Sequence, residues 1–227
     1  MAIIMDGNRR FARNAGMLIE EGHLEGKRKL EQLLDWCLEI GLKVLTVYAF
    51  STENLRREPE EVNRLLRLFT DSFRDIADDE RVHRHRIRVR AIGNRSVLPP
   101  ELVHMIERAE ERTAQYDSYL YNVAIGYGGR EEIVHAIQEI AQEVREGKIT
   151  PDQIDLARVS AHLYTADLPD PDFVLRTSGE ERISNFLLWQ TAYSELYFSD
   201  VYWPGFTKID FLRAIHSFQA RQRRYGK

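Results

Sequence analysis

The stretch AIIMDGNRRFARNAG, residues 2–16, shows how this chain is built. Three apolar residues, Ile3, Ile4 and Met5, run straight into the carboxylate of Asp6. A glycine, an asparagine and three arginines follow within the next seven positions. A short apolar run that ends in a polar, basic turn is typical of a buried strand in a parallel α/β sheet, where ligands bind at the carboxyl ends of the strands. We therefore expect a strand here, followed directly by part of an anion site.

Similar apolar runs recur along the chain and alternate with amphipathic helical patterns. The expected strands are Ala2–Asp6, Lys43–Phe50, Arg86–Gly93, Tyr119–Tyr127, Asp172–Thr177 and Glu195–Phe198. The expected helices are Gly22–Ile40, Pro59–Asp78, Pro99–Tyr116, Arg130–Arg145 and Lys208–Arg224, with a short one within Ser160–Leu168. This alternation predicts an α/β fold with a six-stranded, mainly parallel sheet. No repeat or flexible linker divides the chain, so we expect one domain over residues 1–227.

Composition limits the class of protein and its surroundings. The chain has 227 residues, 43% hydrophobic content and a formal net charge of −4. This charge argues against a surface built for nucleic acid, so any anion site must be local. Cys37 is the only cysteine, which excludes an intrachain disulfide and fits a reducing cytoplasm. We find no apolar run long enough to span a membrane.

Polar and basic residues gather after four of the six expected strands. The groups are Asp6, Gly7, Asn8 and Arg10; Ser51, Thr52, Glu53 and Asn54; Gly128, Gly129 and Arg130; and Arg176, Thr177, Ser178 and Gly179. Parallel strands bring these ends to one edge, which predicts a polyanion site containing one carboxylate. Asp6 by itself fits a helix cap or a Mg²⁺ ligand equally well. The neighbouring arginines favour a metal–diphosphate site.

Three further segments each allow a structural and a functional interpretation. RTSGEERISN, residues 176–185, offers two guanidinium groups and a hydroxyl, which fits a diphosphate clamp or a solvated charged loop. HRHRIRVR, residues 83–90, alternates apolar and basic residues, which favours a half-exposed or edge strand over a nucleic-acid surface. The helix after Pro59 has an apolar stripe that is either a core face or, in part, the lining of a hydrocarbon cavity.

Several motifs together resemble one family. They are IIMDGNRRFA (3–12), YAFSTEN (48–54), GYGGR (126–130), RTSGEERISNFLLWQ (176–190) and AYSELYF (192–198). In this order they resemble the cis-prenyltransferases, the undecaprenyl diphosphate synthase family. The resemblance implies a mostly parallel sheet surrounded by helices, with an elongated apolar tunnel. It also implies repeated condensation of isopentenyl diphosphate onto an allylic diphosphate with new cis double bonds, and Mg²⁺ as cofactor.

The resemblance assigns roles by position. Asp6 matches a metal-associated catalytic aspartate, and Glu195 matches a second carboxylate near the metal. Asn54 matches a catalytic position next to the reacting carbons, and the proton acceptor stays open between Asp6, Asn54 through water, and the diphosphate. The substrate-binding positions are Gly7, Asn8, Arg9, Arg10, Phe11, His23, Ser51, Glu53, Arg57, Arg176, Arg182, Ser184, Arg224 and Gly226. Among them, Arg176, Arg182 and Ser184 form the isopentenyl diphosphate clamp.

The C-terminal Arg224 and Gly226 resemble a tail that family dimers lend to the neighbouring subunit, so we expect a homodimer. We expect a cytoplasmic protein without a membrane span, associated peripherally with the membrane through its lipid product. The alternatives are a non-catalytic partner subunit of a prenyltransferase complex, a nucleic-acid-binding protein using the basic segments near Arg84 and Arg221, and a generic phosphatase or nucleotide enzyme. Retention of Asp6 and the clamp arginines speaks against the first of these.

Overall fold

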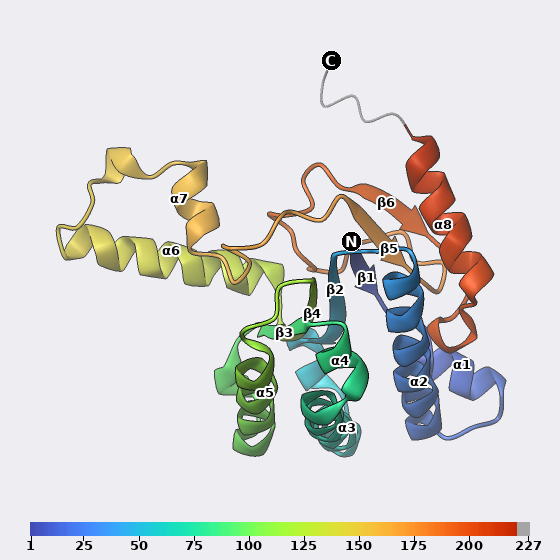
Figure 1. Ribbon diagram of the computed structural model, residues 1–227. Coiled ribbons are helices and arrows are strands. Elements are labelled where there is room, and N and C mark those ends of the chain that lie inside the picture. Colours follow the sequence, from blue (N-terminus) through green and yellow to red (C-terminus); the bar gives the residue numbers. More distant parts are fainter. Residues whose placement is uncertain (222–227) are drawn as a thin grey trace.

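A single six-stranded sheet organises the chain in the computed structural model, which describes residues 1–221 (Figure 1). The strands are β1 (Ala2–Ile4), β2 (Val44–Ser51), β3 (Ile87–Ile92), β4 (Tyr119–Tyr127), β5 (Phe173–Arg176) and β6 (Glu195–Phe198). Their order is β3-β4-β2-β1-β5-β6, and every pairing is parallel. The predicted sheet is confirmed, and β1 lies near its centre, with the turn after Ile4 at the carboxyl edge.

Helices fill most of the connections between strands. They are α1 (Asn8–Asn14), α2 (Ile19–Glu39), α3 (Pro59–Asp78), α4 (Glu80–Arg84), α5 (Pro100–Thr113), α6 (Gly129–Arg145), α7 (Leu156–Ala161) and α8 (Lys208–Ala220). Short 3₁₀ turns follow β2 at Thr52–Arg56 (η1) and precede α8 at Trp203–Gly205 (η4). Figure 1 shows α2, α3 and α5 side by side, while α6 and α7 extend away from the sheet. Between residues 1 and 221, no helix combines the length and apolar composition that a membrane crossing requires.

The two faces of the sheet are covered in different ways. Alternate strand side chains point to opposite faces, so Ile3 and Val47 pack with α2, α3, α5 and α8 in the larger core. Ile4 and Tyr48 point the other way and pack against Phe186 in a smaller core. Most of that second cover comes from the irregular segment between β5 and β6, because Phe186 and its neighbour Leu187 are fully buried there. This irregular cover brings the RTSGEERISN segment against the sheet.

Most predicted elements agree with the structure to within a few residues. Two short helices, α1 and α4, were not predicted because each is only one or two turns long and dense in arginine. The short helix expected within 160–168 lies earlier, at α7, because Asp155 caps it by accepting a hydrogen bond from the Arg158 backbone N–H at 2.7 Å. The segment 83–90 ends α4 and then begins β3, which is an edge strand as expected, with Val89 buried and Arg88 exposed.

A cavity of about 680 Å³ lies between the strands and the helices α2 and α3. Its apolar lining includes Leu30, Leu34 and Leu38 from α2 and Leu65, Leu68, Phe69, Phe73 and Ile76 from α3. The stripe on α3 therefore serves both purposes considered above, because Leu65 and Phe73 are also buried in the larger core.

Candidate active site

The turn after β1 places Asp6 at the carboxyl edge of the sheet. The Asp6 backbone is fixed by Thr177, whose hydroxyl accepts from the Asp6 N–H at 3.0 Å and donates to the Asp6 carbonyl at 2.7 Å. Gly7 follows with φ +108°, and a Cβ there would lie 2.9–3.0 Å from Tyr202. Only glycine fits both the positive φ and the close approach. The chain can therefore leave the strand and enter α1 with Arg10 directed back over Asp6.

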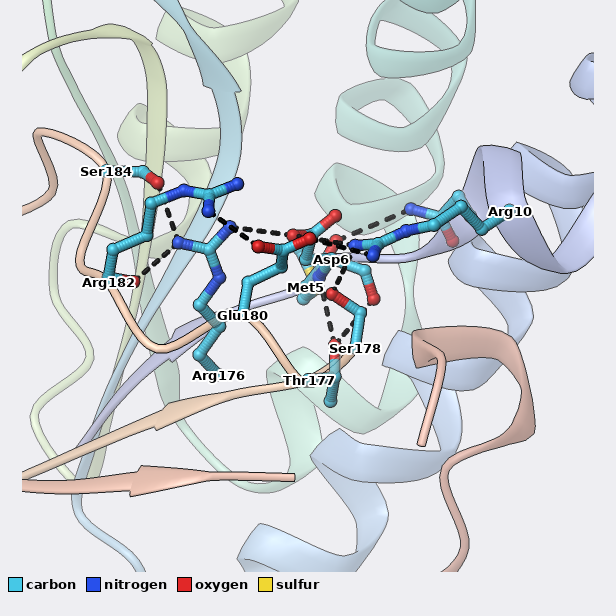
Figure 2. A network of polar contacts seen from close by, with 10 residues as sticks. Met5, Asp6, Arg10, Arg176, Thr177, Ser178, Glu180, Arg182 and Ser184 are labelled. Carbon is cyan, nitrogen blue, oxygen red and sulfur yellow. Dashed lines mark hydrogen bonds and ion pairs between the residues drawn. The ribbon is translucent and has the colours of Figure 1, made fainter. Parts of the chain in front are cut away.

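Arg176, the last residue of β5, is the centre of the polar network in Figure 2. Its side chain is only 5% exposed, and Nη2 donates to Asp6 Oδ2 at 2.7 Å. Nη1 donates to the Ser184 hydroxyl at 2.6 Å and to the Arg182 carbonyl at 2.5 Å. One guanidinium group thus ties the turn after β1 to the loop after β5, and it fixes Ser184 in the same step.

Arg10 approaches the same carboxylate from α1. Its Nη2 lies 3.3 Å from Asp6 Oδ2 and donates to the Ser178 hydroxyl at 2.6 Å, while Nη1 donates to Glu180 at 2.9 Å. The second Glu180 oxygen accepts from Arg182 Nη1 at 2.5 Å. Figure 2 shows the Glu180 carboxylate between these two arginines. Three of the predicted substrate-binding arginines, Arg10, Arg176 and Arg182, are therefore within one connected network.

This environment keeps Asp6 ionised. Burial opposes the charged form, but hydrogen bonds from Arg176 and Ser178 and the charges of Arg176 and Arg10 outweigh it. The pKa of Asp6 therefore lies below its usual value. A carboxylate of this kind is a weak base and a good ligand or counter-charge.

A second cluster surrounds Glu61 at the start of α3. Arg57 Nη1 donates to Glu61 Oε1 at 2.9 Å, and Arg9 Nη2 lies 3.6 Å from Oε2. His23 Nε2 is 3.7 Å from Oε1, which is too long for a hydrogen bond. Burial, then the charges of Arg57 and Arg9, lower the pKa of His23 to about 4 against the opposing effect of Glu61. The imidazole is thus neutral at pH 7, while two guanidinium groups face it.

A third cluster follows β2, where the YAFSTEN motif ends. The Ser51 N–H donates to Asn54 Oδ1 at 3.0 Å, and the Asn54 N–H donates to the Ser51 hydroxyl at 3.2 Å. This reciprocal cap fixes both side chains at the start of η1. Glu53 accepts from Asn185 Nδ2 at 3.0 Å, which joins this turn to the segment that carries Ser184.

The three clusters open into the cavity between α2 and α3. Of the predicted site residues, those that line it are Asp6, Asn8, His23, Ser51, Glu53, Asn54, Arg57, Arg176 and Ser184. The Oδ1 atom of Asn8 is buried and lacks a hydrogen-bond partner among the described residues. The cavity therefore has a polar, guanidinium-rich end and apolar walls that continue away from it.

Two of the predicted residues that the structure describes are not brought into this arrangement. Phe11 packs toward the η4 turn, where its ring lies 3.9 Å from the position of a Cβ on Gly205. Glu195 starts β6 beside Phe173, three residues before the level of Arg176, and its carboxylate accepts from Arg221 at 2.8 Å. Within one chain, the two predicted metal carboxylates therefore lie at opposite ends of their strands. Arg224 and Gly226 lie outside the described residues.

Sequence reasoning missed several polar residues that build the site. They are Glu61, Glu180 and Asn185, whereas Thr177 and Ser178 were already among the polar residues expected after the fifth strand. Glu61 lies in the first turn of α3, four residues after Arg57, which precedes that helix, and this short separation is the one sequence signal for their pairing. Glu180 and Asn185 lie in the RTSGEERISN segment, where attention to the arginines and Ser184 left them without a role.

The donor set determines how a Mg²⁺ ion could be held. Within residues 1–221, no three histidine, cysteine, aspartate or glutamate side chains gather into a ready-made metal site. Asp6 is one ionised carboxylate, with 30% of its side chain exposed, beside the guanidinium groups of Arg10 and Arg176. Mg²⁺ is commonly bound by one or two carboxylates, with water and substrate phosphate oxygens completing the octahedron. The residues fit the ion in that mode.

Comparison with known proteins identifies the family. The family model described as "Putative undecaprenyl diphosphate synthase" matches residues 4–226. The chain belongs to the undecaprenyl diphosphate synthase family. A tritrans,polycis-undecaprenyl-diphosphate synthase (geranylgeranyl-diphosphate specific) from Thermoplasma acidophilum is 56% identical over 227 residues, covering 100% of this chain and 88% of that protein. The corresponding protein from Methanocaldococcus jannaschii is 53% identical and covers 100% and 82%.

Solved structures agree with this assignment. The crystal structure of lavandulyl diphosphate synthase from Lavandula x intermedia, in complex with dimethylallyl diphosphate, has a TM-score of 0.96 at 37% identity, covering 100% of this chain and 97% of that one. A probable undecaprenyl diphosphate synthase from Campylobacter jejuni has a TM-score of 0.79 at 33% identity with the same coverage. The prediction of a prenyltransferase that condenses isopentenyl diphosphate onto an allylic diphosphate is confirmed at the level of the family.

Proposed function

We propose that this enzyme extends geranylgeranyl diphosphate by repeated addition of isopentenyl diphosphate, and that the product is a long polyprenyl diphosphate with new cis double bonds. The primer is inferred from the names of relatives that share 52–57% identity over the whole chain. The observation that carries the proposal is the continuity of the site. The cavity of about 680 Å³ has guanidinium groups around one ionised carboxylate at its polar end, and its apolar walls continue directly from that end. This combination suits a diphosphate joined to a long hydrocarbon chain.

Two groups of residues bind the two diphosphate substrates. Gly7, Asn8, Arg9 and Arg10 are placed to receive the allylic diphosphate, and Arg176, Arg182 and Ser184 are placed to receive isopentenyl diphosphate. Guanidinium groups aimed at the leaving diphosphate stabilise the charge that develops as the allylic C–O bond breaks. Holding the alkene of isopentenyl diphosphate beside the allylic carbon supplies proximity and orientation. The apolar cavity excludes water and receives the hydrocarbon tail.

Asp6 is the residue that would hold Mg²⁺, together with diphosphate oxygens. When bound, the ion supplies charge neutralisation at those oxygens. Because the pKa of Asp6 is lowered, its carboxylate is poorly suited to accept the proton that leaves during condensation. The Asn54 amide carbonyl is already occupied by the Ser51 N–H. These two facts favour the diphosphate as the proton acceptor, with Asn54 and Ser51 orienting the substrates.

We also propose a homodimer in which Arg224 and Gly226 of one chain complete the isopentenyl diphosphate site of the other. Placement in the cytoplasm, with peripheral membrane contact through the lipid product, belongs to the same proposal. The dimer is tested by mixing two inactive variants, Asp6→Ala and Arg224→Ala, under conditions where subunits exchange. Recovered activity supports a shared site, because one of the two heterodimer sites is then intact. Verified exchange without recovery contradicts it.

The activity itself is tested with labelled isopentenyl diphosphate, Mg²⁺ and allylic diphosphate primers of increasing length, up to the 20-carbon geranylgeranyl diphosphate. We expect the 20-carbon primer to give the highest kcat/KM and a product several units longer. Chromatography separates the products by length. Preference for a shorter primer would overturn the choice of primer, and the absence of any incorporation would overturn the activity.

A further inference from the structure

Glu180 is the acidic residue at the mouth of the site to which the mechanism above gives no role. It lies on the loop after β5, and its side chain is 29% exposed. Its two carboxylate oxygens go to different arginines, Oε1 to Arg10 at 2.9 Å and Oε2 to Arg182 at 2.5 Å. Figure 2 shows this carboxylate between the two guanidinium groups. Each carboxylate oxygen therefore occupies one arginine, in the way that a diphosphate oxygen would pair with the same guanidinium group.

The two arginines come from different parts of the proposed machinery. Arg10 stands on α1 with the allylic diphosphate group, and Arg182 belongs to the isopentenyl diphosphate clamp. Both terminal nitrogens of Arg10 are engaged by protein acceptors, namely Asp6, Ser178 and Glu180. Among the described residues, Glu180 is the only acceptor of the Arg182 guanidinium group. The allylic diphosphate at Arg10 and isopentenyl diphosphate at Arg182 must therefore each compete with this one carboxylate.

Charge and exposure make Glu180 the exchangeable acceptor. Asp6 is held by the buried Arg176 and by its own backbone bonds to Thr177. Glu180, in contrast, pairs with two partly exposed arginines, 38% and 61% exposed, and partly exposed ion pairs are weak because water competes for both partners. The charges and hydrogen bonds of Arg182, and those of Arg10, lower the pKa of Glu180, so it is ionised at neutral pH. Next to it, Gly179 adopts φ +73°, a backbone conformation that glycine reaches without strain.

We propose that Glu180 is an internal substitute for diphosphate: its carboxylate occupies Arg10 and Arg182, each of the two diphosphates must displace it from the arginine that it binds, and its return to Arg10 helps to expel pyrophosphate after each condensation. The proposal rests on the proposed function, because it takes both arginines as diphosphate ligands. It adds to that function a residue, Glu180, whose effect is to lower the affinity of the site for diphosphate. In a reaction that repeats many times, a site that held pyrophosphate too firmly would delay the next addition.

The test is calorimetric titration with inorganic pyrophosphate in EDTA, which measures the arginine site without turnover or metal. Three full-length proteins are compared: the wild type, Glu180→Gln and Glu181→Gln. Glu181 is exposed, and no hydrogen bond or ion pair from its side chain is seen among the described residues. Both variants therefore remove one negative charge from the same loop, but only the first releases the arginines.

We expect Glu180→Gln to bind pyrophosphate about tenfold more tightly than the wild type, equivalent to 1.4 kcal/mol, and Glu181→Gln to stay close to the wild type. In the condensation assay, Glu180→Gln should be correspondingly more sensitive to inhibition by added pyrophosphate. Equal affinities for the two variants, or weaker binding by Glu180→Gln, would overturn the proposal while leaving the enzymatic activity intact. If no protein bound pyrophosphate and none incorporated isopentenyl diphosphate, the proposed function would fail with it.

Discussion

The two parts of the cavity are built in contrasting ways. At its polar end, β1, α1 and the loop after β5 are joined by short hydrogen bonds through Arg176 and Arg10. Along its walls, α2 and α3 face each other across apolar side chains and are connected at the surface by ion pairs such as Lys27–Asp75 at 2.7 Å. The polar end is specified by direction and charge, whereas the walls are specified by volume and apolarity. A change at the polar end should therefore alter the rate, and a change in the walls should alter the length of the product.

Asp6→Ala is the strongest challenge to the polar end. It removes the carboxylate that Arg176 and Arg10 share, and losing one preorganised electrostatic element typically lowers kcat by about 10²–10³. Steady-state incorporation of labelled isopentenyl diphosphate measures the loss, and thermal unfolding checks that the fold survives. The exposed Asp200→Ala is the control and should retain activity. Normal turnover of Asp6→Ala would refute its catalytic assignment.

His23 stands at the border between the polar end and the walls, and it predicts how stability depends on pH. The unfolded histidine takes a proton near pH 6.5, whereas burial and the charges of Arg57 and Arg9 hold the folded pKa at about 4. The contribution is complete above pH 6.5 and is lost as the pH falls toward 4, because only the unfolded chain binds the proton in that window. The loss amounts to roughly 3 kcal/mol, at 1.36 kcal/mol per pKa unit.

His23→Gln should flatten this part of the curve of unfolding free energy against pH, measured by urea titration between pH 4 and 7. His104→Gln, an exposed histidine on α5, is the matched control and should leave the wild-type slope unchanged. An unchanged slope in His23→Gln would show that the buried imidazole is not the group responsible.

Arg176→Lys tests whether direction matters as well as charge. Lysine keeps the positive charge but cannot reach Asp6, Ser184 and the Arg182 carbonyl together. Charge-assisted hydrogen bonds contribute about 1.5–3 kcal/mol, so kcat/KM for isopentenyl diphosphate should fall about 10–100-fold. Arg88→Lys on the exposed edge strand is the control, and its kcat/KM should equal that of the wild type. Full activity in Arg176→Lys would show that charge alone is sufficient.

Leu34→Trp tests the walls. Leu34 lines the cavity from α2, and the larger ring should shorten the product by roughly one to three five-carbon units, because an overpacked space resists added atoms. Leu24→Trp, on the exposed side of the same helix, should give products of wild-type length. An unchanged product distribution for Leu34→Trp would separate this cavity from the hydrocarbon tail.

The same contrast explains how far sequence reasoning could go. The order of strands and the residues after them could be predicted because hydrophobic periodicity and polar strand ends are local signals. Arg10, Arg176 and Ser184 were therefore placed in one site before their distances were known. The bridge made by Glu180 and the cluster around Glu61 depend on how separate loops meet, and no local pattern encodes that meeting. Glu195 also depended on a motif position alone, and within one chain it lies at the start of β6, away from Asp6, so its metal role stays a prediction.

The most direct test of the account measures, in one experiment, the rate of the first condensation and the final product length. Labelled isopentenyl diphosphate and geranylgeranyl diphosphate are mixed with the wild type, Arg176→Lys and Leu34→Trp, first for a single turnover and then to completion. We expect Arg176→Lys to slow the first condensation without changing the final length. We expect Leu34→Trp to shorten the product without slowing the first condensation. If either variant changed both quantities together, the division between a directing polar end and an accommodating apolar cavity would be contradicted.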